Sequence, residues 1–364
     1  MKQQTGARIK GPVRIVGTGL LGTSIGLGLS KLGVPVYLED ASPANLSLAI
    51  DYGAGVRAGD ADSPAVVVVC VPPDVTASVV VAELTKFPNA VVTDVASVKA
   101  QLLRELEASG ADLSRYVGSH PMAGRERGGA LSGRVDLFVG RPWVISGNPN
   151  NSPAAISLIE DLAMDLGAAP LKVSAHDHDR AVALVSHVPQ LVSSLLAARL
   201  IDSDAADVAL AGQGLRDTTR IAASDPKLWL QILAANASEV APVLKAFEAD
   251  VHELIESLEN ITRAGSLAKV SRALEAGNRG VERIPGKHGA KQTTYAQVVV
   301  MIADKPGELG RLFNEVGEIG VNIEELKLEH SPSAQIGLVE LYVLPAVERQ
   351  LVADLEGRGW QIAG

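Results

Sequence analysis

The stretch VRIVGTGLLGTSIGLGLSKLG, residues 13–33, passes from an apolar run of the strand type into a glycine-rich turn and then into a helical pattern. Each glycine of the turn suits a phosphate-binding loop for a different reason. Gly17 permits the tight turn, Gly19 lets the backbone approach a pyrophosphate, and Gly22 allows a helix to pack closely on a strand. The N-terminus of the following helix presents unpaired N–H groups to an anion. The stretch therefore predicts the first βα unit of a dinucleotide-binding fold.

An acidic pair, Glu39 and Asp40, follows about twenty residues later, at the end of the second predicted strand. A carboxylate at this place accepts hydrogen bonds from a ribose hydroxyl, and Asp40 is the better candidate of the two. No arginine adjoins it, which favours NAD over NADP because the acid would repel the extra phosphate of NADP. The NAD-binding residues predicted in the turn and at the strand ends are Gly17, Gly19, Leu20, Leu21, Gly22, Asp40, Val71 and Ser97.

Short apolar runs alternate with helical patterns through the first part of the chain, residues 11–174. The runs are VRIVG, PVYLED, AVVVVCVP, AVVTDVAS, RYVGSHP and PWVISG. Strands that alternate with helices are typical of βαβ units, in which helices cover both faces of a parallel sheet. The sequence thus predicts an α/β domain over residues 11–174, built on a doubly wound parallel sheet of the Rossmann type.

The rest of the chain divides into three segments with different sequence patterns. Residues 175–278 hold long helical stretches in which apolar residues recur at spacings of three and four. Helices with more than one apolar face need a partner, so we expect an all-helical domain that pairs two chains in a homodimer. Residues 279–293 are rich in Gly, Lys and Arg, which is typical of a linker. Residues 294–364 follow the order strand, helix, strand, strand, helix, strand, which predicts a small ferredoxin-like domain.

Composition narrows the classes of partner. The chain has 364 residues, a formal net charge of −9 and 3% aromatic residues. A nucleic-acid surface needs a basic patch and aromatic side chains for stacking, so we do not expect nucleic acid to bind. The single cysteine, Cys70, cannot form an intramolecular disulfide. The polar N-terminus and the absence of an uninterrupted apolar run of membrane-spanning length predict a soluble cytoplasmic protein with no membrane partner.

The segment VGSHPMAGRERGG, residues 117–129, places His120 at the end of a predicted strand and ahead of a glycine-rich turn. The carboxyl ends of parallel strands line the ligand crevice of an open sheet, so we expect Ser97, Lys99 and His120 beside the cofactor. Histidine suits proton removal near neutral pH because its ordinary pKa is about 6.5. A purely structural histidine is the alternative interpretation.

The helical segment carries LRDTTRIAASDPKLWLQI, residues 215–232. Asp217 lies three residues before Arg220, so on a helix it can orient the guanidinium toward one face. The tripeptide SDP is a helix-start signal, and Trp229 follows it. A surface salt bridge beside a core tryptophan would show the same pattern.

Five spaced motifs carry a family resemblance: GTGLLG, DVASVK, GSHPMAGRERGG, VSHVPQ and GLRDTTRIAASDPKLW. In this order they resemble the prephenate dehydrogenases and their arogenate-using relatives, over about residues 12–275. The resemblance implies oxidative decarboxylation, in which NAD takes a hydride from the ring carbon that bears the hydroxyl. The ring carboxylate leaves as carbon dioxide and an aromatic ring forms.

The resemblance also implies roles for single residues. His120 takes the proton of the 4-hydroxyl, Ser97 hydrogen-bonds in the same network, and Arg220 binds the substrate's side-chain carboxylate. The positions that match others lining the family's pocket are Glu126, His187, Asp217 and Trp229. Prephenate carries a keto group where arogenate carries an ammonium, so a carboxylate such as Asp217 or Glu126 could favour arogenate. The sequence leaves that choice open.

The last segment, with DKPGELGRLFNEVGEIGVNIEEL, looks like an ACT domain, a regulatory module that often binds an amino acid. Asp304, Gly307 and Asn322 match places where such domains meet a ligand at a strand-to-helix turn. This predicts feedback inhibition by L-tyrosine. A domain used only for dimerisation is the alternative.

Two other motifs point to competing chemistry. GTSIG, residues 22–26, matches the nucleophile elbow of hydrolases, yet Ser24 falls inside a predicted helix instead of on a sharp turn after a strand. AHDHDR, residues 175–180, offers His176 and His178, but it also fits a helix start with Asp177 or Asp179 near the N-terminus. We therefore expect no metal site.

Two other functions remain as alternatives. A 3-hydroxyacid dehydrogenase would place a catalytic lysine on a helix of the second domain, and SHVPQLVSS offers none. A non-catalytic sensor that binds a nucleotide and an amino acid would have no need of Ser97, His120 and Arg220 together.

Overall fold

The computed structural model describes residues 6–59, 62–124, 128–285, 295–330 and 336–363. The chain forms two compact units, Met1–Phe247 and Glu248–Gly364. Each unit has its own secondary structure and its own hydrophobic core.

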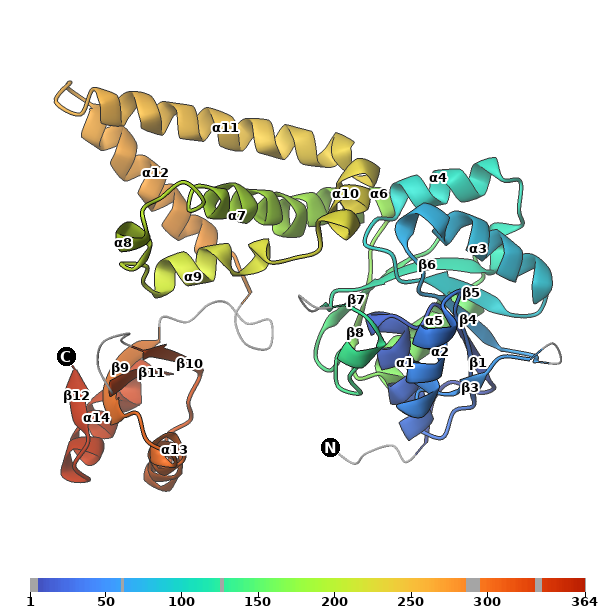
Figure 1. Ribbon diagram of the computed structural model, residues 1–364, viewed down its shortest axis with the longest axis horizontal. Helices are drawn as coiled ribbons and strands as arrows, with labels where there is room; N and C mark the ends of the chain where they lie inside the picture. Colours follow the sequence, from blue (N-terminus) through green and yellow to red (C-terminus); the bar gives the residue numbers. More distant parts are fainter. Residues whose placement is uncertain (1–5, 60–61, 125–127, 286–294, 331–335, 364) are drawn as a thin grey trace. The chain divides into compact units, whose positions relative to one another are not determined.

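An eight-stranded sheet forms the centre of the first unit (Figure 1). Its strands are β1 (Val13–Val16), β2 (Val36–Glu39), β3 (Val56–Arg57), β4 (Val66–Val69), β5 (Val91–Asp94), β6 (Tyr116–Pro121), β7 (Pro142–Ser146) and β8 (Ala169–Lys172). They lie in the order β3-β2-β1-β4-β5-β6-β7-β8. The parallel strands β1 to β6 and the reversal of order beside β1 confirm the predicted Rossmann-type class.

The sheet is mixed at one end, which the sequence did not predict. Strand β7 runs antiparallel to β6, and β8 runs parallel to β7. A parallel strand needs a crossover connection, usually a helix, whereas the described part of the segment between β6 and β7 holds only a 3-10 turn, Ala130–Ser132. Strand β7 therefore returns beside β6 in the opposite direction.

Helices cover both faces of this sheet. Helices α1 (Leu20–Lys31), α2 (Pro43–Asp51) and α5 (Pro153–Asp165) pack on one face, and α3 (Pro73–Lys86) and α4 (Ala100–Ala108) pack on the other. Alternate strand residues enter the two cores, as Val68 and Val67 of β4 do. Burial on both faces explains why strands such as β4 are continuously apolar.

A set of helices follows the sheet. They are α6 (Ala175–Val182), α7 (Val188–Ala198), α8 (Ala205–Val208), α9 (Gln213–Thr219), α10 (Pro226–Ala235), α11 (Ala237–Glu259) and α12 (Ser266–Val281), with a 3-10 turn, Arg220–Ala222, after α9. The helical stretch of residues 226–259 is divided at Asn236, between α10 and α11. Asp225 caps α10 and Pro226 is its first residue, which confirms the predicted SDP start.

A π-helical segment, Ala183–His187, joins α6 to α7. Pro189 lies in the first turn of α7 and has no N–H, so the carbonyl of Val185 lacks its α-helical donor. The continuous run Ala175–Ala198 is long and apolar enough to cross a membrane by length and composition. The run also carries His178, Asp179 and His187, which are buried and hydrogen-bonded within the protein. Polar groups paired in this way fit a helix packed in a folded core.

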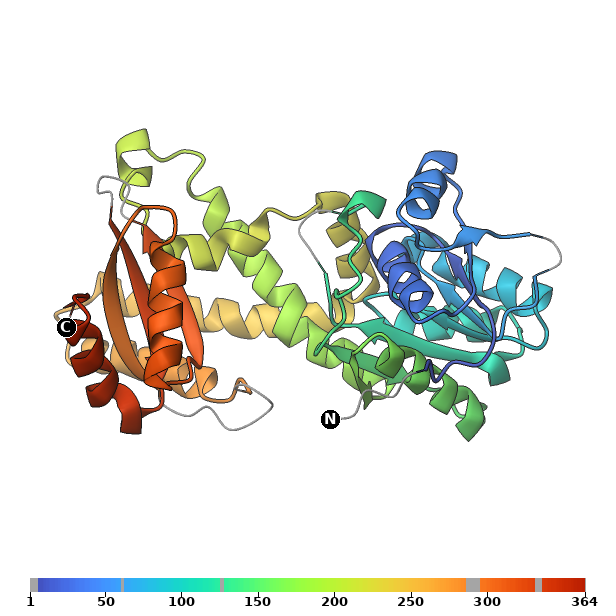
Figure 2. The same ribbon diagram turned by 90° about the horizontal axis from the view of Figure 1, so that it is seen from below.

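The C-terminal part is a four-stranded antiparallel sheet with two helices packed on it (Figure 2). Its elements are β9 (Ala296–Ala303), α13 (Glu308–Ile319), β10 (Glu325–His330), β11 (Ile336–Val343), α14 (Glu348–Gly357) and β12 (Gln361–Ala363). The strand order is β10-β11-β9-β12. Leu312 and Leu355 of the helices share one core with Val300 and Leu341 of the sheet. The predicted ferredoxin-like βαββαβ order is confirmed.

Candidate active site

The glycine turn between β1 and α1 has the geometry that its spacing predicts. Gly17 has φ +98°, and a Cβ there would lie 2.5 Å from the carbonyl oxygen of Cys70. A Cβ at Gly22 would lie 1.9 Å from the carbonyl oxygen of Gly17, so α1 packs directly on the turn. Gly19 caps α1 without a side-chain hydrogen bond, and a Cβ there would meet nothing within 4 Å. The turn therefore leaves room and N–H donors for a phosphate.

Asp40 connects the turn to the end of β2. One carboxylate oxygen accepts hydrogen bonds from the N–H and the hydroxyl of Thr18, at 2.6 and 2.8 Å, and the other accepts from the N–H of Ser42 at 2.7 Å. A carboxylate offers about four acceptor sites, so capacity remains for a ribose hydroxyl. Glu39 instead forms an ion pair with the buried guanidinium of Arg14. Asp40 therefore contacts the glycine turn and Glu39 does not, which is consistent with the choice of Asp40 as the candidate for the ribose contact.

The other predicted cofactor residues lie at the same edge of the sheet. Leu20 and Leu21 form the first turn of α1 and are partly buried. Val71 follows β4 and Ser97 follows β5, and both side chains are partly buried. The strand ends therefore bring these residues to the carboxyl edge of the parallel sheet, where ligands bind in folds of this class.

Buried Asp94, at the end of β5, organises the polar floor of this edge. Its carboxylate accepts hydrogen bonds from the hydroxyl of Tyr116 at 2.7 Å and from the N–H of Ala96 at 2.9 Å, and it forms an ion pair with Lys99. Burial and the negative charge of Asp94 raise the pKa of Tyr116 well above its usual value. Lys99 is 2% exposed, so its charge balances Asp94 and is not presented to solvent. The floor fixes the ends of β5 and β6 relative to each other.

His120 lies at the carboxyl end of β6, one residue before its last, and is the first of a series of polar side chains in contact. Its Nδ1 lies 2.9 Å from Nε2 of His178, and Nδ1 of His178 lies 2.7 Å from Oδ1 of Asp179. The carboxylate of Asp179 also accepts the N–H groups of Lys99 and Ala100, each at 2.8 Å, at the N-terminus of α4. His178 and Asp179 are buried, while His120 is partly exposed. The series of contacts is therefore accessible at His120 and buried at Asp179.

The protonation states follow from this environment. Burial, followed by the nearby His178, Lys99 and His187, holds the pKa of His120 well below its ordinary value. Burial alone would raise the pKa of Asp179, but hydrogen bonds from His178 and from the backbone outweigh it and lower that pKa. At neutral pH the site therefore pairs a neutral imidazole, able to accept a proton, with an ionised carboxylate.

A second histidine lies close by on the π-helical segment. His187 is 2% exposed, and its Nδ1 lies 3.1 Å from the side-chain amide nitrogen of Asn236. The same amide nitrogen donates to the backbone carbonyl of Asp179 at 2.9 Å. The rings of His187 and Trp229 meet edge to face, with centroids 5.9 Å apart. Burial lowers the pKa of His187 to about 4. The fold thus brings two of the four predicted pocket residues, His187 and Trp229, into contact.

The predicted clamp lies on α9 and the turn after it. Arg220 begins the 3-10 turn and is exposed, and Asp217 is exposed on α9. Asp217 accepts a hydrogen bond from the side-chain amide of Gln213 at 2.8 Å, so Gln213 holds this carboxylate. Glu126, the remaining predicted pocket residue, lies outside the described residues.

The sequence interpretation of AHDHDR missed part of the site. Ser174 caps α6 and accepts the N–H of Asp177 at 3.1 Å, so the predicted helix start is confirmed. Yet His178 contacts His120, and Asp179 caps α4 instead of its own helix. Adjacent His and Asp at this place were the only sequence signal. Asn236, which connects Asp179 to His187, gave no signal at all.

Two further predictions concern residues outside this site. Ser24 lies inside α1, where its hydroxyl donates to the carbonyl of Leu20 at 2.7 Å, so the hydrolase elbow is excluded. In the C-terminal sheet domain, Gly307 caps α13 with φ +95°. Asn322 donates to Glu324 at 2.6 Å, and Asp304 and Asn322 are exposed.

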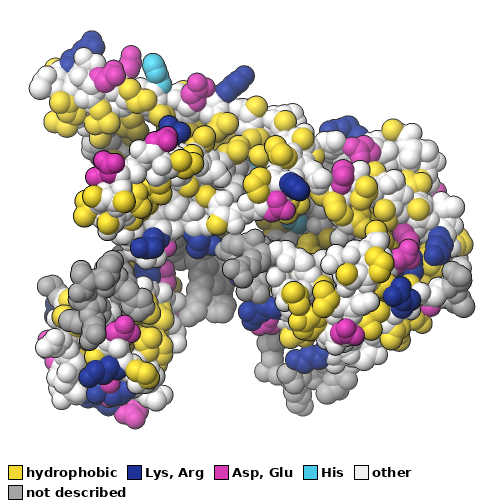
Figure 3. All heavy atoms as spheres, viewed as in Figure 1, with side chains coloured by type: hydrophobic (Ala, Val, Ile, Leu, Met, Phe, Trp, Pro, Cys, Tyr) yellow, Lys and Arg dark blue, Asp and Glu magenta, His cyan; other side chains and the backbone are white. Residues whose placement is uncertain are grey.

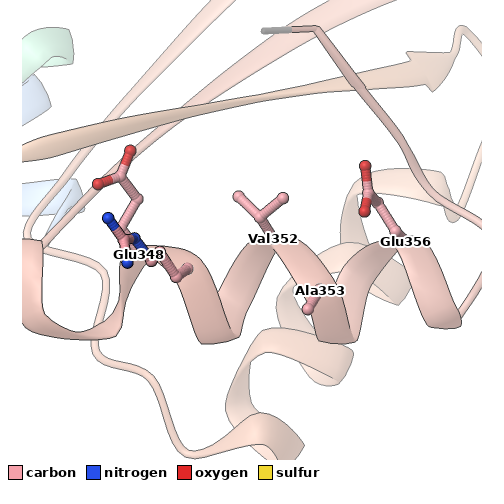
Figure 4. A pocket seen from close by; sticks show the side chains of 5 residues that line it. Glu348, Val352, Ala353 and Glu356 are labelled. Atoms are coloured by element: carbon pink, nitrogen blue, oxygen red, sulfur yellow. The ribbon is translucent and has the colours of Figure 1, made fainter.

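A hollow of about 430 Å³ lies along α14 in the same domain (Figure 4). Glu348, Arg349, Val352, Ala353 and Glu356 line it. All five come from one helix, and none of the predicted ligand residues is among them.

Comparison with known proteins fits this geometry. The family model described as the nucleotide-binding domain of prephenate dehydrogenase matches residues 25–171, and the model of the dimerization domain matches residues 174–271. The probable prephenate dehydrogenase NovF of Streptomyces niveus is 37% identical over 353 residues, which cover 95% of this chain and 98% of NovF. The cyclohexadienyl dehydrogenase of Zymomonas mobilis is 30% identical over 258 residues, which cover 66% of this chain and 86% of that protein.

A solved structure agrees with these relatives. Prephenate dehydrogenase from A. aeolicus, in complex with hydroxyphenyl propionate and NAD+, has a TM-score of 0.66 and 26% sequence identity. The match covers 75% of this chain and 99% of that one. The two family models together span more than half of the chain, and NovF matches nearly all of it. The chain belongs to the prephenate dehydrogenase family.

Proposed function

We propose that this protein catalyses the NAD-dependent oxidative decarboxylation of prephenate to 4-hydroxyphenylpyruvate, a step toward tyrosine. The observation that carries the proposal is His120, a neutral histidine at the carboxyl end of β6 whose Nδ1 is bonded to a buried partner. Its other ring nitrogen can accept a proton at neutral pH. The glycine turn and Asp40 occur at the same sheet edge and fit a dinucleotide.

Each residue then has a chemical task. His120 removes the proton of the 4-hydroxyl, and Ser97 hydrogen-bonds to the same hydroxyl. NAD, when bound, accepts the hydride from the ring carbon, and loss of the ring carboxylate as carbon dioxide completes an aromatic ring. Arg220 binds the side-chain carboxylate, because a guanidinium matches a carboxylate with two parallel hydrogen bonds. His187, Trp229 and Asp217 line the substrate pocket, and Glu126, which lies outside the described residues, is assigned to it from the sequence alone.

The helical segment supports a homodimer. Its exposed apolar side chains include Leu184, Val185, Leu195, Leu196, Ile201 and Leu210, and Figure 3 shows hydrophobic side chains spread over this segment. Ile201 and Leu210 are 80% and 84% exposed. Apolar surface of this extent is typical of an interface, and the matching family model describes a dimerization domain. We place the domain boundaries at residues 11–174, 175–278, 279–293 and 294–364, in a cytoplasmic enzyme.

For the C-terminal domain we propose an ACT-like regulatory role in which L-tyrosine binds near Asp304, Gly307 and Asn322. The βαββαβ order and the left-handed Gly307 at the start of α13 support this proposal. Titration calorimetry should show heat with tyrosine. No heat with tyrosine, phenylalanine or tryptophan would leave the domain a structural role.

Arogenate is the alternative substrate. The carboxylate of Asp217 accepts one hydrogen bond from Gln213 and keeps acceptor sites that could pair with the ammonium group of arogenate. The neutral keto group of prephenate needs no such partner. A non-catalytic sensor, the other alternative, has no use for the contacts that hold His120.

Appearance of NADH with prephenate, and separately with arogenate, tests the proposal. We expect faster turnover of prephenate. The His120→Asn variant should lower kcat by about a hundredfold or more and leave NAD affinity nearly unchanged, because only proton removal is lost. A wild-type protein that binds NAD and turns over neither compound would favour the sensor.

A further inference from the structure

We propose that His178 and Asp179 are positioning residues that hold His120 in the tautomer protonated on Nδ1, which leaves Nε2 as the base. The inference rests on the proposed function, because it names the nitrogen that removes the substrate's proton. It concerns residues that the sequence interpretation treated only as the start of α6.

The three side chains form one continuous line of contacts between two elements. His120 is the next-to-last residue of β6, while His178 and Asp179 lie on α6. The contacts are 2.9 Å between the two imidazoles and 2.7 Å between His178 and the carboxylate. The rings of His120 and His178 meet edge to face, with centroids 5.1 Å apart and an interplanar angle of 80°. This interplanar angle is compatible with a nitrogen-to-nitrogen hydrogen bond between the two imidazoles, whereas stacked rings cannot aim their nitrogens at each other.

The place of each ring proton decides which group donates and which accepts in each hydrogen bond of this line. An ionised carboxylate can only accept, so the proton between Asp179 and His178 lies on Nδ1 of His178. Taken as a neutral ring, His178 has no second ring proton, so its Nε2 is an acceptor. The proton in the next hydrogen bond must then lie on Nδ1 of His120. Nε2 of His120 is left with its lone pair and faces away from the buried line.

The carboxylate at the far end is itself held in place. Asp179 accepts the N–H groups of Lys99 and Ala100, which point out of the first turn of α4. These donors stabilise negative charge, as the N-terminus of a helix does generally. Hydrogen bonds from the backbone cannot change tautomer, so they fix Asp179 as an acceptor and make the direction of the whole line permanent. The same line stabilises His120 once it is protonated, because its Nδ1–H already has an acceptor.

A volume-filling role for His178 would predict a different outcome for substitutions. The side chain is 1% exposed, so His178→Phe keeps a ring in the same space and removes both nitrogens. His178→Gln gives up the ring and keeps an acceptor oxygen near the place of Nε2. A positioning role therefore predicts that Gln is better than Phe, and a packing role predicts the reverse.

The experiment compares these two variants with the wild type and with His176→Phe. His176 lies on the same helix with an exposed side chain, which makes it the matched control. We expect His178→Phe to lower kcat for prephenate by about tenfold to a hundredfold with KM changed less than about threefold, within the range of general-base catalysis. His178→Gln should recover most of that loss, and His176→Phe should behave as the wild type. Equal or better turnover by the Phe variant than by the Gln variant would overturn the proposal.

A second measurement does not depend on turnover. Histidine ring ¹⁵N NMR distinguishes the two tautomers, and His120→Asn assigns the signal. We expect His120 of the wild type to carry its proton on Nδ1 and to lose that preference in His178→Phe. A proton on Nε2 in the wild type would overturn the proposal. If the protein turned over neither substrate, the proposed function would fail and the NMR result would still decide how His120 is held.

Discussion

Lowering the pH should destabilise this protein well before its carboxylates titrate, because the folded protein holds two histidines, His187 and His120, without charge. His187 is the better defined of the two, with a pKa of about 4 caused by burial. An unfolded histidine has a pKa of about 6.5. The native pKa is the lower one, so between these two values the unfolded state binds a proton that the native state does not. The free energy of unfolding therefore falls as the pH falls from 6.5 toward 4, and it is fully regained above pH 6.5.

The size of the effect follows from the two pKa values. One unit of pKa difference corresponds to about 1.36 kcal/mol. Integrated from pH 7 to pH 5, the difference between about 4 and 6.5 amounts to about 2 kcal/mol for His187 alone. His120 acts in the same direction, since burial also lowers its pKa. The wild type should therefore lose more than this amount, and a variant without His187 should lose about 2 kcal/mol less.

Urea unfolding followed by tryptophan fluorescence, at pH 7 and at pH 5, measures the change. His187→Gln removes the titrating ring and keeps a side chain that can bond to Asn236. His252→Gln removes an exposed histidine as the matched control. The quantity compared is the loss of stability between the two pH values, so any constant cost of a substitution cancels. If His187→Gln and His252→Gln lost as much stability as the wild type, the buried neutral His187 would be refuted.

Two further predictions concern the nucleotide turn and the clamp. Gly22→Ala should lower Tm even without NAD, because its Cβ would lie 1.9 Å from the carbonyl oxygen of Gly17. Gly19→Ala should keep Tm and weaken NAD binding, because its Cβ enters open space where a phosphate would lie. Equal Tm values for the two variants in differential scanning fluorimetry would contradict this prediction. Arg220→Ala should raise the KM for prephenate by about tenfold or more, which corresponds to a loss of about 1.4 kcal/mol of binding free energy. Steady-state kinetics that showed only weaker NAD binding would contradict the proposal that Arg220 binds the substrate's carboxylate.

Local sequence rules predicted the sheet well because its requirements are local. The glycine turn is an example: Gly17 and Gly22 each avoid a clash with a nearby backbone oxygen, and such a clash recurs wherever a strand, a tight turn and a helix follow one another. Continuous apolar runs such as β4 likewise follow from burial on both faces. The direction of β7 is not local. It depends on whether a crossover helix forms between β6 and β7, and a glycine-rich segment leaves that undecided.

The contacts of His120 with His178 and of His178 with Asp179 could not be predicted, because they depend on bringing distant parts of the chain together. His120 and His178 are 58 residues apart, and Asp179 caps a helix 80 residues before it. A pair of His and Asp near a helix start already has a sufficient local explanation, since Ser174 and Asp177 do form the cap. Nothing in the pattern shows that the next residue, His178, turns inward. The π-helical segment that carries His187 depends in the same way on how Pro189 is accommodated, and a periodicity of 3.6 does not reveal it.

Asp179 contacts two parts of the site, the pair His178 and His120 and the pair Asn236 and His187, through different atoms. Its side chain fixes His178 and, through it, His120, while its backbone carbonyl accepts from Asn236, whose amide nitrogen also meets His187. Its remaining hydrogen bonds hold the start of α4, which belongs to the nucleotide-binding sheet. The docking of α6 on α4 therefore sets the position of His120, the proposed base, and of His187, the proposed pocket histidine, at the same time. A displacement of α6 would separate His120 from its acceptor and His187 from Asn236 together, so proton removal and substrate binding should be lost together, and neither should be tunable through α6 alone.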